Sequence, residues 1–445
     1  MRTSVRGAVA TVALASALLA AGCSSGTGSN GSSGTATNST KSSEKVALTF
    51  WSWVPNIDKV VDVWNKQNPN IQVHYFKVAQ GDPAVTKLLT AIKGGSGAPD
   101  VTLAEFQTIP ELVVSNAVLD ISSYVPADVK GKFSEGDWTA ATLGGKAVYG
   151  IPEDTGPMEL YYRKDVFAKL GLAVPKTWDE YAAAAKTIHA ANPKQYLGTF
   201  SSADAGEFAG LTQQAGASWW GTSGTSWKVN INSDASKKVA GFWGGLVQSG
   251  VIANQPQYTP QWNTDLNNGT QVGWISAACA AGVLAGNAQD TAGKWAMAPL
   301  PQWDPSSPAT GDWGGSVNAV TTQTKHPAEA AKFVIWLDAS VDGVKGLVQQ
   351  GGVFPSDTAD VGKLFDVPPP FFSNQPDFYK QLVDISKTVN PFTYGPNVNA
   401  AYSSFNDEFG KAAQAKKQAD FLTALDTMQA TTVADLTQKG FKVVK

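Results

Sequence analysis

Residues 46–78 read VALTFWSWVPNIDKVVDVWNKQNPNIQVHYFKV. The run 46–51 predicts a strand. Apolar side chains then recur at the spacing of one helical face, at Ile57, Val60, Val61 and Trp64. Asn56 is the expected N-cap of this helix, Pro69 follows its end, and residues 71–78 predict a second strand. The strand–helix–strand pattern indicates an α/β fold.

The alternation of helices and strands continues beyond this segment. A second helix is predicted over residues 85–92, ending at Gly94-Gly95, and the apolar run 100–104 predicts a buried parallel strand. Thr177-Trp178-Asp179-Glu180 forms a capping box that begins another helix, and a further helix is predicted from Pro327. In an open sheet of this kind, ligands bind beyond the carboxyl ends of the strands.

The first 23 residues have the three parts of a secretory signal. Two arginines precede an apolar run over residues 8–21, which is too short to span a bilayer, and Gly22 precedes Cys23. Residues 18–23 resemble a bacterial lipobox, although Ala20 stands where leucine is usual. We therefore expect cleavage after Gly22, palmitate on Cys23, and export to the outer face of the cell membrane, with the lipid as the only membrane anchor. An ordinary signal peptide with an incidental cysteine is the alternative.

Between this signal and the folded body lies a polar segment. Residues 24–45 are mostly Ser, Gly, Thr and Asn, which carry too little apolar surface to fold. We expect a flexible linker with a mean span of roughly 25 Å. The body that follows, residues 46–445, is too long for one core, so we expect two lobes. Its tail from Asn397 is predicted to be mostly helical.

Composition excludes several classes of function. Loss of residues 1–22 removes Arg2 and Arg6 and moves the formal charge from −3 to −5, which gives no electrostatic reason for nucleic-acid binding. With Cys23 acylated, Cys279 has no intramolecular partner, and we expect it to be a small buried hydrophobe. The three histidines lie far apart in the sequence, so no metal and no cofactor is expected.

Short motifs follow one another in a characteristic order along the mature chain. They are LTFW (48–51), APDV (98–101), YGIP (149–152), LYYRKD (160–165), PKTWDE (175–180), GDWGGS (311–316) and a His-Pro segment at 326–333. Together they resemble the extracellular solute-binding proteins, family 1, of bacterial ABC sugar importers. The resemblance implies a two-lobed α/β fold of the periplasmic-binding-protein type (type II), with the ligand in the cleft between the lobes.

The resemblance also implies how the chain divides. It would cross between the lobes three times, near residues 153–157, 308–312 and 353–357. The N-terminal lobe would contain residues 46–153 plus 312–354, and the C-terminal lobe residues 154–311 plus 355–445. Closure around a sugar would then be a hinge motion, and the closed form would dock on the ABC permease subunits. We expect the receptor to be a monomer.

Position along the chain selects candidate ligand-binding residues. Sugars present flat C–H faces, which aromatic rings cover, and a rim of hydroxyls, which polar groups satisfy. Fifteen tryptophans are enough for some to contact a ligand, and several stacked rings favour a di- or oligosaccharide. Trp53 and Glu105 each follow a predicted strand of the first lobe. For Glu105, a solvated loop charge is the alternative.

Further candidates lie at the presumed crossings. One of the adjacent carboxylates Glu153 and Asp154 could accept two hydroxyl hydrogen bonds, although adjacent loop carboxylates are often only solvated. At the second crossing the candidates are Trp313, whose indole could stack on a ring, and Gly314 and Gly315, which would admit the backbone close to a ligand. The alternative is a glycine-rich turn with a packed tryptophan. Weaker candidates are Asp312 and Trp274, and below them Trp219, Trp220, Trp243 and Tyr394.

An enzyme is the rival class. A glycoside hydrolase needs two carboxyl groups roughly 5–10 Å apart, which Glu105 with Glu153 or Asp312 could supply. The sequence contains neither a Gly-x-Ser-x-Gly elbow nor a His-Glu-x-x-His helix. Arg163, the only arginine of the mature chain, is expected to pair with a nearby carboxylate. We therefore predict a binding protein without enzymatic activity, and a surface adhesion or scaffold lipoprotein is a third possibility.

Overall fold

The computed structural model of the chain describes residues 45–79, 81–357, 359, 364 and 367–444. The predicted signal segment, Cys23 and residues 24–44 of the predicted linker lie outside these described residues. The ordered body contains two principal sheets, each covered by helices, which form the two lobes that the chain length predicts.

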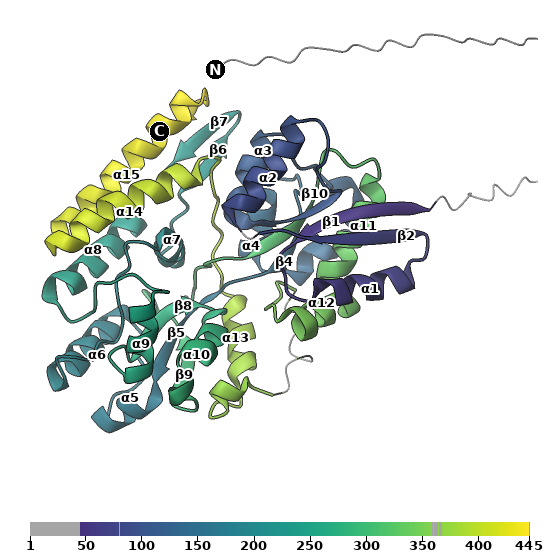
Figure 1. The fold of residues 1–445 in the computed structure, drawn as a ribbon. Helices are drawn as coiled ribbons and strands as arrows, with labels where there is room; N and C mark the ends of the chain where they lie inside the picture. Colours follow the sequence, from purple (N-terminus) through teal and green to yellow (C-terminus); the bar gives the residue numbers. More distant parts are fainter. Residues whose placement is uncertain (1–44, 80, 358, 360–363, 365–366, 445) are drawn as a thin grey trace, which may run out of the picture. The chain divides into compact units, whose positions relative to one another are not determined.

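The sheet of the first lobe has five strands in the order β2-β1-β3-β10-β4 (Figure 1). The strands are β1 (Val46–Ser52), β2 (Ile71–Lys77), β3 (Val101–Glu105), β4 (Ile151–Asp154) and β10 (Ser316–Val320). The predicted strands β1, β2 and β3 are confirmed, and β1 pairs in parallel with both β2 and β3. Strand β10 runs antiparallel to β3 and β4. Its first residue therefore lies at the same edge as the last residues of β3 and β4.

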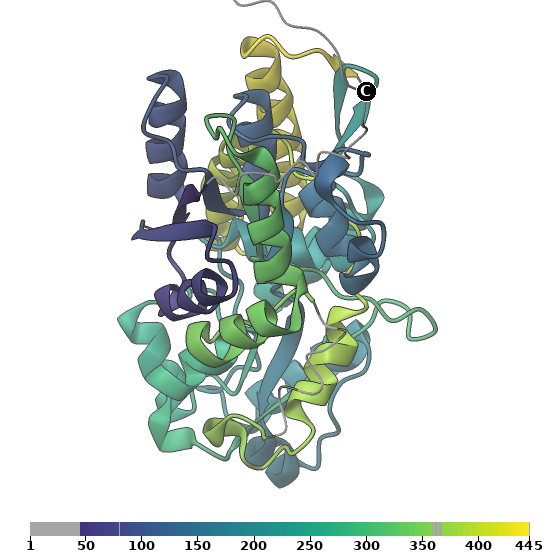
Figure 2. The same cartoon turned by 90° about the vertical axis from the view of Figure 1, so that its right-hand side faces the viewer.

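Helices of the first lobe bury the apolar side chains that the sequence pattern picked out. They are α1 (Ile57–Gln67), α2 (Asp82–Lys93), α3 (Ile109–Val114), α4 (Glu135–Thr142), α11 (Pro327–Ala339) and α12 (Val341–Gly346). The Phe333 ring lies 5.3 Å from that of Phe50 and 5.4 Å from that of Trp64, so β1, α1 and α11 share one core. Figure 2 shows α12 (green) beside α1 (purple).

The second lobe is built on a three-stranded antiparallel sheet in the order β8-β5-β9. Its strands are β5 (Met158–Arg163), β8 (Gly273–Ala277) and β9 (Trp295–Pro299), and the helices around it are α5 (Lys164–Leu170), α6 (Trp178–Ala191), α9 (Pro260–Asn268), α10 (Ala280–Asn287) and α13 (Phe378–Ser386). Large aromatic side chains, Tyr161, Trp262, Trp274 and Trp295 among them, fill its core.

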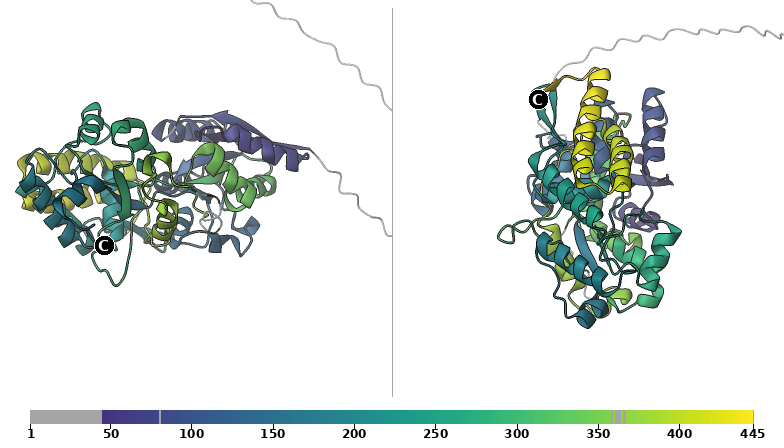
Figure 3. Two further views of the ribbon diagram at one scale, coloured as in Figure 1. Left: turned by 90° about the horizontal axis from the view of Figure 1, so that it is seen from below. Right: turned by 90° about the vertical axis from the view of Figure 1, so that its left-hand side faces the viewer.

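A helical layer completes the second lobe. It consists of α7 (Ala205–Gln214), α8 (Asp234–Ser249), α14 (Val398–Ala415) and α15 (Gln418–Gln438), with α14 and α15 side by side (Figures 1 and 3). Trp219, Trp220 and Trp243 are buried beside this layer, which makes them core residues. The small sheet β11-β7-β6 contains β6 (Trp220–Ser223), β7 (Ser226–Val229) and β11 (Val443–Val444). The mostly helical prediction for the tail therefore missed β11.

Short helical turns lie between these elements. They are η1 (Phe106–Thr108), η2 (Ser122–Tyr124), η3 (Val129–Lys132), η4 (Gln289–Thr291), η5 (Leu347–Gly351) and η7 (Pro370–Phe372). Within the described ranges, the structure contains no helix with the length and apolar character that crossing a membrane requires.

The helix caps test the local predictions. The capping box of α6 is confirmed, because Thr177 Oγ1 accepts from the Glu180 N–H at 3.2 Å and Glu180 Oε2 accepts from the Thr177 N–H at 3.3 Å. Asn56 is the N-cap residue of α1 as predicted, but its side chain makes no capping hydrogen bond. Asn56 adopts a left-handed conformation (φ +54°) and its amide donates instead to the Gln350 carbonyl at 3.1 Å.

Candidate functional site

Two predicted site carboxylates meet at one edge of the five-stranded sheet. Glu105 ends β3 and Asp154 ends β4, and both are paired with Ser316 at the start of β10. The Ser316 hydroxyl donates a hydrogen bond to Asp154 Oδ1. Gln107 Nε2 donates to Glu105 Oε2 at 2.7 Å. Burial raises the pKa of Asp154 above its ordinary value, so this edge of the sheet disfavours negative charge.

Three chain segments run side by side between the two sheets. Residues 155–157 join β4 to β5, residues 310–315 lead into β10, and residues 353–357 form the third segment. They are joined by hydrogen bonds from Met158 N–H to Gly311 O (3.0 Å), Trp313 N–H to Gly156 O (2.8 Å), Thr155 N–H to Phe354 O (3.2 Å) and Ser356 N–H to Glu153 O (3.0 Å). These three hydrogen-bonded segments, which lie near the three predicted crossings, are referred to as the hinge.

Trp313 lies on the second crossing, half-buried against the second lobe. A Cβ added to Gly206, in the first turn of α7, would come within 2.7 Å of Trp313 Nε1. The indole therefore packs directly on the helix backbone, and any larger residue at position 206 would displace it. The Trp313 ring also lies 6.1 Å from that of Tyr258, at an interplanar angle of 70°.

The two glycines after Trp313 both have left-handed backbone conformations, with φ +113° at Gly314 and +86° at Gly315. A Cβ on Gly315 would lie 2.3 Å from the Phe106 ring, so this glycine is required for packing against η1. No neighbouring atom lies within 4 Å of a Cβ at Gly314. Close approach of the Gly314 backbone to a ligand stays a prediction. The backbone of Gly315 closely approaches the Phe106 ring.

Tyr258 is an aromatic residue of this region that the sequence analysis missed. Its side chain is 44% exposed, and its backbone is in the left-handed region (φ +57°), which is uncommon outside glycine and asparagine. Its ring stands edge-on to Trp274 at 5.6 Å. Trp274 itself is 1% exposed, and its Nε1 donates to Gln257 Oε1 at 2.8 Å. Trp274 therefore supports Tyr258 from the core, and Tyr258 is the ring that a ligand can reach.

A hollow of about 340 Å³ lies between the lobes. Its lining comes from η1 and from the first three turns of α14, and consists of Gln107, Thr108, Asn399, Tyr402, Ser403 and Asn406. These side chains offer amides, hydroxyls and one phenol, which is the chemistry that a rim of ligand hydroxyls requires. None of the six was a candidate from the sequence.

The hollow is continuous with the edge of the sheet. Gln107 is hydrogen-bonded to Glu105. The pKa of Tyr402 is raised first by its own burial and then by the nearby charge of Glu105. Trp53, half-buried at the end of β1, lines a small neighbouring cavity of about 10 Å³ together with Glu105 and Thr108. The structure therefore brings the candidates Trp53 and Glu105 together beside the hollow.

Two other candidate carboxylates point into the protein. Glu153 is 1% exposed, and its Oε2 accepts from Asn318 Nδ2 at 2.6 Å, an amide that also donates to Asp338 of α11. Burial, and then repulsion from Asp154, raises the pKa of Glu153 to about 8. Asp312 is 6% exposed, and its Oδ1 accepts from the Gly156 N–H at 2.6 Å. We leave both out of the ligand-contacting set, because their oxygens already serve the core and the hinge.

The family of the chain follows from its sequence profile. Residues 51–339 match the profile of the bacterial extracellular solute-binding proteins, a span of more than half of the 445 residues. The chain belongs to this family. Membership confirms the resemblance drawn from the motifs and the predicted export of the protein.

Similar proteins of known identity span almost the whole chain. The arabinooligosaccharide-binding protein of Bacillus subtilis is 23% identical over 434 residues, 93% of each chain. The lactose-binding protein of Rhizobium radiobacter is 24% identical over 405 residues, 86% of this chain and 92% of its own.

Two solved structures share the fold at higher identity. The galacto-N-biose-/lacto-N-biose I-binding protein of the ABC transporter from Bifidobacterium longum, in complex with lacto-N-biose, is 31% identical, with a TM-score of 0.77 over 90% of this chain and 99% of its own. The ABC transporter associated binding protein from B. animalis subsp. lactis Bl-04, in complex with β-1,6-galactobiose, is 26% identical, with a TM-score of 0.72 over 90% of this chain and all of its own. They confirm the two-lobed α/β fold.

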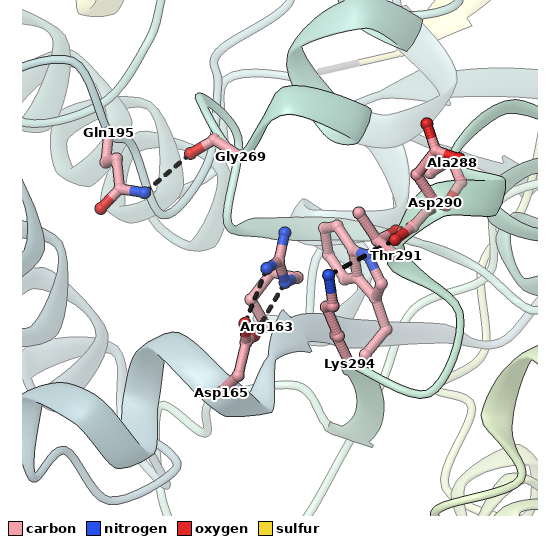
Figure 4. A network of polar contacts seen from close by, with 9 residues as sticks. Arg163, Asp165, Gln195, Gly269, Ala288, Asp290, Thr291 and Lys294 are labelled. Carbon is pink, nitrogen blue, oxygen red and sulfur yellow. Dashed lines mark hydrogen bonds and ion pairs between the residues drawn. The ribbon is translucent and has the colours of Figure 1, made fainter.

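Two further side chains of this solute-binding protein settle smaller predictions. Arg163 pairs with Asp165 through Nε (2.8 Å) and Nη2 (2.7 Å), as Figure 4 shows, so the predicted carboxylate partner is confirmed. Cys279 is exposed, just after β8, and the prediction of a buried position is wrong. It precedes α10, where the strand pattern of its neighbours no longer applies. Among the described residues, no group of histidine, cysteine and carboxylate side chains has the arrangement of a metal site.

Proposed function

We propose that this solute-binding protein captures a di- or oligosaccharide in the hollow between its lobes and delivers it to the permease subunits of an ABC importer. The observation that carries the proposal is the hollow, which η1 lines from one lobe and α14 from the other. A ligand held by both walls would stabilise the closed arrangement of the hinge.

Side chains of the second crossing, with its neighbour Tyr258, and side chains of the hollow match the two kinds of surface on a sugar. Trp313 and the exposed Tyr258 offer aromatic faces and edges for the C–H patches of a ring. The amides of Gln107, Asn399 and Asn406 both donate and accept, as hydroxyl groups do. The names and titles of the similar proteins, which include arabinooligosaccharide, lactose, lacto-N-biose and β-1,6-galactobiose, support the same ligand class.

We divide the chain into lobes as the resemblance implies, with residues 46–153 plus 312–354 in the first and 154–311 plus 355–445 in the second. The sheet β8-β5-β9 uses only residues of the second set, and the five-stranded sheet only residues of the first, apart from Asp154 at the end of β4. In this division Trp313 belongs to the first lobe by sequence, yet it packs on Gly206 and Tyr258 of the second.

We also propose that the protein acts as a monomer anchored by lipid on Cys23 after cleavage at Gly22. A single acyl chain gives only marginal membrane binding, so stable anchoring requires more than one chain. Metabolic labelling with a palmitate analogue in a bacterial host should label the wild type and leave Cys23→Ser unlabelled and released into the medium. Labelling of Cys23→Ser to the wild-type level would refute the anchor site.

The function is tested by titration with a panel of neutral sugars, namely arabinobiose, lactose, lacto-N-biose and β-1,6-galactobiose. At least one should change the tryptophan fluorescence saturably and release or absorb heat on binding. Chromatography of the recovered sugar should then return it intact, because we propose no catalysis. The proposal fails if no member binds, or if hydrolysed sugar accumulates in proportion to the protein concentration.

A further inference from the structure

The lining of the hollow carries no positive charge. Its six side chains, as far as the structure describes them, are three amides, two aliphatic hydroxyls and one phenol: Gln107, Asn399, Asn406, Thr108, Ser403 and Tyr402. All six can satisfy neutral hydroxyls, but they cannot neutralise a carboxylate, sulfate or phosphate. An anion taken into such a site loses its hydration without gaining a counter-charge.

Three cations outside the lining already make contacts of their own. The Lys87 ammonium lies 4.0 Å from the centre of the Trp51 ring. Lys132 pairs with the buried Asp357 at 3.2 Å. Arg163 is held by Asp165. Moving any of these groups to an anionic ligand would first break the contact that it makes now.

The N-terminus of helix α7 lies against Trp313, and two acidic residues of the protein lie beside it. The first turn of α7 lies against Trp313, and a helix N-terminus attracts anions. Asp204 precedes this helix and Glu207 lies in its first turn. Glu207 is 5% exposed, and its Oε2 accepts from Gln257 Nε2 at 2.8 Å. An anion approaching this end of α7 would therefore also meet two acidic side chains of the protein.

Buried carboxyl groups at the chain crossings and at the start of α7 show how the protein treats a charge without a counter-charge. Burial raises the pKa of Asp154 and of Asp204, and holds those of Glu207 and Asp312 well above their ordinary values. For Glu207 and Asp312, repulsion from a neighbouring carboxylate adds to the shift. In each case the charge is disfavoured because no cation in the described part of the chain compensates for its desolvation, and an anionic ligand enclosed by the six neutral side chains would meet the same cost.

We infer that the site selects neutral sugars and rejects sugars that carry a carboxylate, sulfate or phosphate. This inference rests on the proposed function, because it concerns the ligand class of the same hollow. Rejection by an uncompensated charge is a form of specificity that needs no additional contact to the accepted ligand.

The test compares three forms of one sugar. It uses the neutral sugar of the panel that binds most tightly, and two analogues in which the C6 hydroxymethyl of a terminal ring is replaced by a carboxylate or by a carboxamide. The two analogues have nearly the same shape and differ in charge. Calorimetric titration at neutral pH should give a carboxylate affinity about tenfold or more below that of the carboxamide. The difference in affinity between the two analogues should narrow as the pH falls from about 7.5 to about 5.5, because the acidic analogue can then bind in its protonated, neutral form.

A gain-of-charge variant tests the cause. Asn406→Lys places an ammonium in the lining and should reduce the carboxamide-to-carboxylate affinity ratio by about tenfold. Gln414→Lys, an exposed position on the same helix outside the lining, should leave the ratio unchanged. Equal affinity for both analogues in the wild type overturns the inference while the transport function stands. An unchanged ratio in Asn406→Lys overturns the charge argument, and failure of every neutral sugar to bind refutes the proposed function itself.

Discussion

Trp313 joins the second crossing to the second lobe, and we propose that it also contacts the ligand. Its backbone N–H holds the first crossing at Gly156, and its indole packs on Gly206 and stands edge-on to Tyr258. A sugar ring stacked on this indole would therefore contact a side chain that the first crossing, α7 and Tyr258 hold in place.

Replacing Trp313 by alanine should weaken binding of the panel sugar by about tenfold or more, or ~1.4 kcal/mol, because the stacking face is lost. Trp303→Ala is the matched control, since Trp303 is also half-buried but packs against Trp178 and Phe242 outside the hollow. Calorimetric titration measures both variants, with circular dichroism to confirm the fold. A wild-type affinity in Trp313→Ala would remove this residue from the site.

The neighbours Glu153 and Asp154 illustrate what sequence alone leaves open. Successive side chains of a strand point to opposite faces. Glu153 therefore turns toward α11 and Asp338, whereas Asp154 turns toward Ser316 and the hinge. The sequence analysis treated the pair as a loop, where no such alternation applies. Only the pairing of β4 with β10 determines which carboxylate faces which side.

At the scale of the elements, α14 supplies most of the polar lining through one face. Its contributions recur at intervals of three and four residues, at Asn399, Tyr402, Ser403 and Asn406, which is the spacing of a helical stripe. The sequence analysis followed apolar periodicity, which finds the buried face of a helix and overlooks a polar stripe on its other side. The same pattern, searched for polar side chains, would have selected these residues.

Elements with strong local signals were predicted well, and those made by distant partners were not. The β1–α1–β2 unit, the capping box of α6 and the start of α11 at Pro327 all follow from neighbouring residues. Strand β11 contains only Val443 and Val444 and exists because it pairs with β7, more than two hundred residues away. Such pairing leaves no local pattern in the chain.

The capping box gives a prediction at this scale. Thr177→Ala removes the side chain that accepts from the Glu180 N–H, and should lower the free energy of unfolding by about 1 kcal/mol. Thr187→Ala is the control on the same helix, because its hydroxyl bonds only the Ala183 carbonyl on an exposed face. Chemical denaturation compares the two, and equal midpoints would contradict the stabilising role of the cap.

At the scale of the whole molecule, buried carboxyl groups gather where the lobes are joined. Asp137 of α4 is 1% exposed, and its Oδ1 accepts from Thr155 Oγ1 of the first crossing at 3.0 Å. Burial is the main cause that raises its pKa to about 7, with repulsion from Asp154 in addition. Burial likewise raises the pKa of Glu153 to about 8. Below about pH 7, Asp137 and Glu153 therefore keep protons in the folded protein that the same carboxyl groups lose in the unfolded chain.

The sign of the pH dependence follows from these shifts. Unfolded Asp137 loses its proton near pH 3.8, whereas the folded group keeps it up to about pH 7. Between these values the unfolded state binds fewer protons, so the free energy of unfolding should fall as the pH rises. Asp137→Asn, neutral at every pH, should make that fall shallower. The control is Asp384→Asn. Asp384 is exposed, and because its pKa is lowered it stays ionised in both the folded and the unfolded protein over this pH range. Parallel curves for wild type and Asp137→Asn in chemical denaturation from pH 4.5 to 8 would contradict the assignment.

The central claim, that a sugar is held between the two lobes, is tested most directly by a crystal structure of the protein with the tightest-binding sugar of the panel. We predict that the sugar occupies the hollow, contacts Gln107 or Thr108 on one wall and Asn399, Tyr402 or Asn406 on the other, and covers the Trp313 ring. A sugar bound to one lobe alone, or at a site away from η1 and α14, would contradict the claim.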